Sequence, residues 1–137
     1  MFRFFVQVEV RESVDEGGES EAKRADALSR VGEWLDSSSL MSPFASDRLT
    51  RGELVNTNGV DQVIAFGSRN AENNIVAQLH ELFGLIAEVA PGSYGFGYYL
   101  DANHSRDWNV IVLKRGNVVV EEDPWFSPMV PEVEDAF

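Results

Sequence analysis

The chain has 137 residues, of which 44% are hydrophobic and 11% aromatic, with a net charge of −12 at pH 7 from 23 acidic and 11 basic side chains. This composition excludes a disordered chain, and the length predicts a single domain over residues 1–137. Because there is no cysteine, disulfides, thiolate-bound zinc and a cysteine nucleophile are excluded as well.

The negative charge is concentrated in two segments. Residues 9–26 hold seven acids and three bases, and residues 121–137 hold six acids and no base. Such surfaces repel nucleic acid and anionic membranes but attract basic partners. An excess of acidic residues is also common in proteins simply because it increases solubility, so the charge alone does not identify a partner. The sequence shows neither a signal-peptide pattern nor an apolar stretch of about 18 residues that could span a membrane, so we expect a cytoplasmic protein.

The chain begins with a predicted strand and helix. Apolar residues alternate with polar ones over residues 2–10, which is typical of a half-buried strand, although Phe5 interrupts the polar face. Ser20 is placed to cap a helix whose apolar stripe includes Val31 and Leu35. That helix should end within residues 36–39, which read DSSS.

A hairpin is predicted next. Residues 40–52 show little periodicity and are expected to be irregular. The Asn58-Gly59 pair is a strong turn motif, and it predicts a tight connection between strands at residues 53–57 and 60–68.

The second half of the chain predicts a helix followed by a strand with an unusual face. Between Asn70 and Pro91 apolar residues recur every three or four positions, as on one side of a helix. The strand over residues 93–101 then carries Gly95 and Gly97 two positions apart, which leaves a smooth face that a helix or another backbone can approach closely.

The remaining elements complete the fold class. Residues 108–114 are apolar on both faces, as in a central strand, and residues 115–117 turn the chain into a last strand at 118–123. The order β-α-β-β-α-β-β-β predicts an α+β fold in which two helices pack on a mostly antiparallel sheet. With three prolines from residue 124 onward, the acidic C-terminal tail should be extended.

Catalytic and metal-binding motifs are incomplete. His80-Glu81 lacks the second histidine of a helical zinc motif, because Gly84 stands in its place. His104 and Asp107 are close in sequence, but loop neighbours point in different directions and do not make a catalytic triad. We therefore predict no catalytic residue, no metal and no cofactor, and a small hydrolase using His104 is a further alternative only.

The last third of the chain contains a series of motifs in a fixed order. Residues 92–95 read Gly-Ser-Tyr-Gly, Asp101 opens a loop, residues 108–116 read WNVIVLKRG, and residues 123–128 read DPWFSP. This order over residues 91–135 resembles the Immunity protein 7 family, which comprises small cytoplasmic proteins encoded beside bacterial polymorphic toxins. The resemblance implies a protein that binds and neutralises a cognate toxin and is not an enzyme.

Physical reasoning adds roles within the C-terminal segment. Many toxins of such systems are nucleases with basic clefts, where an acidic inhibitor can take the place of phosphates. Carboxylates would then steer association, while an aromatic side chain anchors the complex; alternatively, both aromatic rings of the tail cover the apolar edge of the sheet. The other open alternative is an acidic adaptor or scaffold domain unrelated to toxins. The predicted toxin-binding residues are Asp101, Asp107, Glu121, Glu122, Asp123, Trp125, Phe126, Glu132, Glu134 and Asp135.

Overall fold

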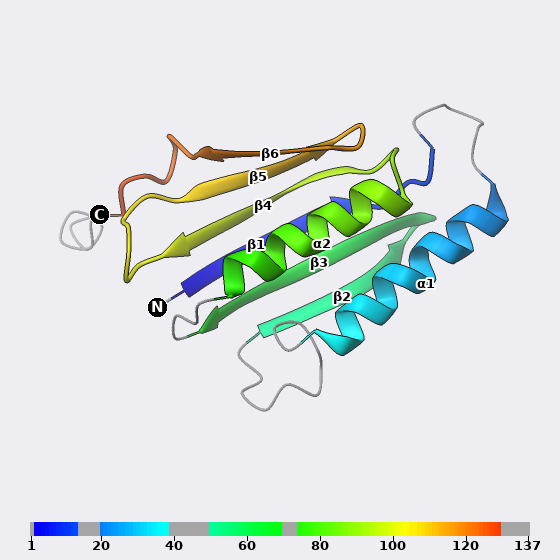
Figure 1. Ribbon diagram of the computed structural model, residues 1–137, viewed down its shortest axis with the longest axis horizontal. Coiled ribbons are helices and arrows are strands. Elements are labelled where there is room, and N and C mark those ends of the chain that lie inside the picture. The colour runs from blue at the N-terminus through cyan, green and yellow to red at the C-terminus, as the bar shows by residue number, and fades with distance from the viewer. Residues whose placement is uncertain (1, 14–19, 39–49, 70–73, 130–137) are drawn as a thin grey trace.

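The computed structural model describes residues 2–13, 20–38, 50–69 and 74–129. Six strands form one antiparallel sheet in the order β2-β3-β1-β4-β5-β6, and both helices lie on the same side of it (Figure 1). The strands are β1 (Phe2–Glu9), β2 (Thr50–Thr57), β3 (Val60–Arg69), β4 (Tyr94–Asp101), β5 (Asn109–Lys114) and β6 (Asn117–Glu122), and the helices are α1 (Glu21–Ser37) and α2 (Ile75–Val89). The predicted α+β class and element order are confirmed.

Strand β1 is central because it pairs with both β3 and β4. Phe5 stands opposite Phe66 on β3 and opposite Tyr98 on β4. The alternation predicted for β1 is confirmed, since Phe2, Phe4, Val6 and Val8 are buried beneath the helices while the intervening side chains face away from them. The strand therefore fixes which face of the sheet is core.

Each helix buries one apolar stripe against the sheet. In α1 the Ser20 side chain accepts a hydrogen bond from the backbone nitrogen of Lys23, as the predicted N-cap requires, and Val31 and Leu35 are buried. In α2 the fully buried residues are Ile75, Leu79, Leu82, Phe83 and Ile86. A hydrogen bond of 2.9 Å from the Trp34 indole to Glu81 links the exposed sides of the two helices.

Two-residue turns set the register of both hairpins. Asn58 and Gly59 have φ angles of 53° and 85°, and Arg115 and Gly116 have 51° and 75°, as type I′ turns require. The predicted Asn-Gly turn is confirmed. Strand β2, however, starts at Thr50, so the end of the segment expected to be irregular belongs to the ladder with β3.

The two glycines of β4 allow the close approach that their spacing predicts. A Cβ atom on Gly97 would lie 2.9 Å from the ring of Phe83 in α2. One on Gly95 would lie 2.3 Å from the backbone oxygen of Gln7 on β1. The space that side chains would take is thus occupied by a helix residue in one case and by a neighbouring strand in the other.

Candidate functional site

The sheet face opposite the helices, which we call the open face, carries a row of exposed aromatic rings. Phe5 and Phe66 are paired across β1 and β3 and are 42% and 49% exposed. The ring of Phe5 lies 6.3 Å from that of Phe96, which in turn lies 5.8 Å from Tyr98. These four residues, Phe66, Phe5, Phe96 and Tyr98, form an aromatic strip across β3, β1 and β4.

Beyond β6 the chain folds back in a turn, residues 123–129, which we call the tail turn. The backbone nitrogen of Asp123 donates to the carbonyl of Trp108 at 2.8 Å, and the Trp108 nitrogen donates to the Ser127 hydroxyl at 2.7 Å. A further backbone bond runs from Met129 to Arg106. The tail turn is therefore attached to the loop before β5 at both of its ends.

Asp123 organises the tail turn from inside. Its side chain is only 1% exposed, and its carboxylate accepts hydrogen bonds from the backbone nitrogens of Trp125 and Phe126. Burial and a hydrogen bond to the same carboxylate raise the pKa of Tyr98. The carboxylate of Asp123, one of the predicted toxin-binding acids, is thus directed into the turn, because the first turn beyond β6 leaves backbone donors that need an acceptor.

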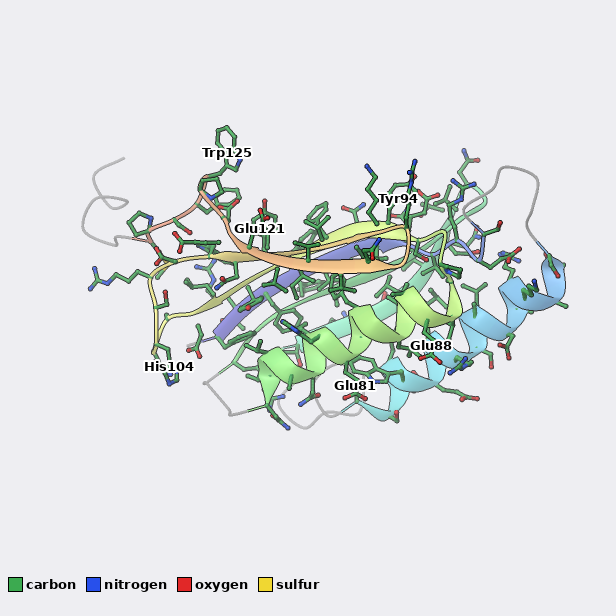
Figure 2. All side chains as sticks on the ribbon, turned by 45° about the horizontal axis from the view of Figure 1, so that its top comes forward. Glu81, Glu88, Tyr94, His104, Glu121 and Trp125 are labelled. Carbon is green, nitrogen blue, oxygen red and sulfur yellow. The ribbon has the colours of Figure 1, made fainter. Side chains whose placement is uncertain are left out.

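The two aromatic residues of the tail turn have different environments. Phe126 packs edge-on against Tyr98, with ring centroids 5.6 Å apart, and also contacts Trp108. Trp125 is 85% exposed and stands away from the sheet on the side opposite the helices (Figure 2). The alternative that both rings cover the sheet is thus wrong for Trp125, whereas Phe126 extends the aromatic strip.

The two remaining acids of the triplet point to opposite sides of β6. Glu121 is paired with Val110, which is paired with Tyr98, so Glu121 lies on the open face. Glu122 follows it and therefore faces the helix side, and both side chains are exposed. Only Glu121 shares a face with the aromatic strip.

The acids of the loop between β4 and β5 lie at the same end of the sheet. Asp101 ends β4, where its carboxylate contacts the His104 imidazole at 2.7 Å and accepts from the backbone of Asn103. Asp107 is half-buried in this loop. Both lie in the loop that the tail turn contacts, although the Asp101 carboxylate is engaged locally. The predicted residues Glu132, Glu134 and Asp135 lie outside the described residues.

The two acidic segments of the sequence do not meet on the described surface. Glu9 is in register with Tyr94 and Lys114, whereas Glu122 is in register with Asn109 at the other end of β5. On the strands, the open face carries both signs of charge, from Arg3, Glu9, Arg51, Glu53, Lys114 and Glu121. The described part of this face is therefore apolar with mixed charges.

Within the four described ranges no three His, Asp or Glu side chains are grouped to hold a metal ion. No helix in these ranges is long and apolar enough to cross a membrane.

A comparison with known families identifies the family of the chain. The family model described as Immunity protein 7 matches residues 1–135. The chain belongs to the Immunity protein 7 family. The match extends to the first ninety residues, where the sequence motifs had supplied no resemblance. No curated protein and no solved structure shows a significant match.

Membership of the Immunity protein 7 family gives the protein a general function. The family consists of immunity proteins of toxin systems, which act by binding a toxin partner and are generally not enzymes. The aromatic strip of this family member was missed in the sequence because its rings come from separate strands. Phe5 interrupts the polar face of the alternating strand β1, and that interruption is the feature that could have indicated it; Phe66 has no such signal, because Val60 and Ile64 share its face of β3.

Proposed function

We propose that this protein is a cytoplasmic immunity protein that binds and neutralises one cognate toxin through the open face and the tail turn. The observation that supports this most directly is Trp125, a large side chain that is 85% exposed on a turn fixed by hydrogen bonds. Tryptophan is prominent among the residues that contribute most to binding at protein interfaces. A fixed turn also reduces the conformational entropy that is lost when the side chain becomes buried.

The surface next to Trp125 has the composition of an interface. Phe126 and the aromatic strip supply a continuous apolar area, which monomeric soluble proteins rarely expose without a function. Glu121 and Arg3 lie on this face as charged neighbours. Arg3 stacks over Trp108 at 5.6 Å, so its guanidinium is held close to the same area. We assign the toxin contact to an apolar centre with a charged rim.

The partner that fits this surface is a basic toxin domain, for which a nuclease with a basic cleft is our preferred case. The support is the net charge of −12 and the six acids and no base in residues 121–137, the segment that contains Trp125. Opposite charge increases the rate of encounter, whereas the desolvated aromatic contact supplies most of the affinity. The other predicted binding residues, Asp101, Asp107, Glu122, Glu132, Glu134 and Asp135, contribute to this steering.

Protection in cells tests the proposal. Co-expression of this protein should rescue growth of bacteria that express the cognate toxin domain, and it should not rescue them from an unrelated toxin. The Trp125→Ala variant should protect poorly at equal abundance. Val60→Ala is the matched control, because Val60 is an exposed apolar residue at the opposite end of the sheet. Full toxicity despite abundant, folded immunity protein would contradict the proposed function.

A further inference from the structure

Strand β6 forms an edge of the sheet, and apolar side chains leave it on both sides. Val118, Val119 and Val120 are 36%, 49% and 38% exposed, and all six residues of the strand are classed as exposed. Val119 shares the open face with Val112, whereas Val118 and Val120 face the helix side. In Figure 1 no other described strand or helix lies beyond the outer side of β6. Such an edge is a template for pairing with another strand.

The register of the β5–β6 hairpin shows which backbone groups of β6 are free to pair. A two-residue turn makes Lys114 and Asn117 a hydrogen-bonded pair, so every second pair along the ladder repeats this bonding. The bond from the Asp123 nitrogen to the Trp108 carbonyl continues the same alternation. The backbone groups of Val118, Val120 and Glu122 therefore point away from β5.

We propose that β6 pairs antiparallel with β6 of a second copy of this chain, about a two-fold axis that passes through Val119. In this register Val118 of one copy stands opposite Val120 of the other, and these two residues exchange their outward backbone hydrogen bonds. Val119 stands opposite itself in a pair without hydrogen bonds. Because directly opposed residues share a face, the two open faces lie on the same side of a twelve-stranded sheet.

The charge pattern along β6 favours a second copy as the occupant. Two bases, Lys114 and Arg115, precede the strand, and two acids, Glu121 and Glu122, end it. Antiparallel pairing about Val119 brings the acids of each copy to the basic turn of the other, with Glu122 opposite Gly116. Moving the axis by one residue to Val120 would instead set these carboxylates opposite valines. An axis at Val118 would also bring acids to bases, with Glu122 opposite Lys114, so the charges disfavour the Val120 register and the cysteine variants below distinguish Val119 from Val118.

The surface area that β6–β6 pairing would bury indicates how tightly the dimer should associate. Pairing of two six-residue strands buries less surface than the roughly 800 Å² per partner of a standard stable interface, so the dimer should dissociate in the micromolar range or above. Its formation needs no toxin. Failure of this inference would therefore leave the proposed function intact, and the reverse also holds.

Sedimentation equilibrium of the full chain, from about 1 to 500 µM, measures the association directly. We expect a monomer–dimer equilibrium for the unmodified protein. Val119→Lys should raise the dissociation constant about tenfold or more, because two like charges then face each other. Val112→Lys is the matched control: it adds the same charge to the same face one strand further from the edge and should dimerise as before.

A cysteine variant tests the register, since the chain has no cysteine of its own. Opposed residues in a pair without hydrogen bonds have Cα atoms about 4.5 Å apart, within the range of a disulfide. V119C should therefore form a covalent dimer under mild oxidation, and V112C should stay monomeric on a denaturing gel. A single monomeric species at all concentrations, or equal cross-linking of both variants, would overturn the proposal.

Discussion

The Oδ2 atom of Asp123 lies 2.6 Å from the backbone nitrogen of Phe126, so a carboxylate with 1% exposure determines how the following aromatic residues are presented. The same oxygen accepts from Trp125 at 3.0 Å. An acid that looks like part of a charged cluster in the sequence is therefore the internal acceptor of a turn.

Replacing Asp123 tests the internal role. Asp123→Ala leaves two backbone donors and the Tyr98 hydroxyl without their acceptor, and it should lower the free energy of unfolding by about 1–3 kcal/mol. Asp123→Asn keeps one acceptor oxygen and should lose less. Urea denaturation of both variants gives the comparison. Equal stability of Asp123→Ala and the unmodified protein would contradict this role.

Trp125→Ala should separate binding from folding. Because the side chain is 85% exposed, its removal should change the unfolding free energy by no more than about 0.5 kcal/mol. Binding to the cognate toxin should weaken by about 2–4 kcal/mol, mainly through faster dissociation. Surface plasmon resonance and thermal melts on the same preparation measure the two effects. An unchanged dissociation rate would remove Trp125 from the interface.

Glu121 and Glu122 form a natural pair of variants, since they are adjacent but face opposite sides of the sheet. Glu121→Gln should slow association with a basic toxin and reduce its dependence on salt, because this charge lies beside the aromatic strip. Glu122→Gln should have the smaller effect. Stopped-flow association between about 0.05 and 0.5 M salt provides the measurement. Equal effects would mean that only the total charge matters.

Alanine substitutions at the two glycines of β4 should lower the unfolding free energy by different amounts. Gly97→Ala places a methyl group against the Phe83 ring, which can shift, and should cost about 1–3 kcal/mol of unfolding free energy. Gly95→Ala meets backbone atoms of β1 and should cost more. Gly84→Ala is the control, because no atom lies within 4 Å of its added methyl group, and it should stabilise α2 by about 0.5–1 kcal/mol. Chemical denaturation measures the order.

Asp61 should make the unfolding free energy of the protein depend on pH in the acidic range. Burial acts to raise its pKa, but hydrogen bonds from Arg24 and Asn56, each 2.8 Å, hold the pKa below its ordinary value. The unfolded chain then binds the proton more readily, so this contribution is present above the unfolded pKa of about 3.9 and is lost as pH falls through the folded pKa. The stability advantage over Asp61→Asn should shrink below about pH 4 in urea titrations.

Local patterns in the sequence predicted most of the fold. The alternation in β1, the Ser20 cap and the Asn58-Gly59 turn each depend on neighbouring residues, and each is confirmed. The start of β2 was missed because Thr50 lies in the ladder through its pairing with Gly67 on another strand. Pairing between distant residues leaves no periodicity in a short, polar segment.

The candidate site was less predictable for the same reason. Trp125 stood out because it lies among acids in one short stretch. Phe66 and Phe96 could be assigned to this surface only from the strand order, which places β3 and β4 on either side of β1 and its Phe5. The separation of Asp123 from Glu121 likewise depends on where the ladder ends, which the sequence does not mark.

The central position of β1 has a consequence for how the sheet is assembled. Phe2 is in register with Asp101, and Glu9 with Tyr94, so this ladder joins segments more than eighty residues apart. Closing such a loop costs conformational entropy before any contact compensates for it, and folds dominated by distant pairings form in milliseconds to seconds. The hairpins β2–β3 and β4–β5–β6 can form early from local contacts, but neither holds the core together without β1. During synthesis, the strand made first must wait for β4 to leave the ribosome before its second ladder can form.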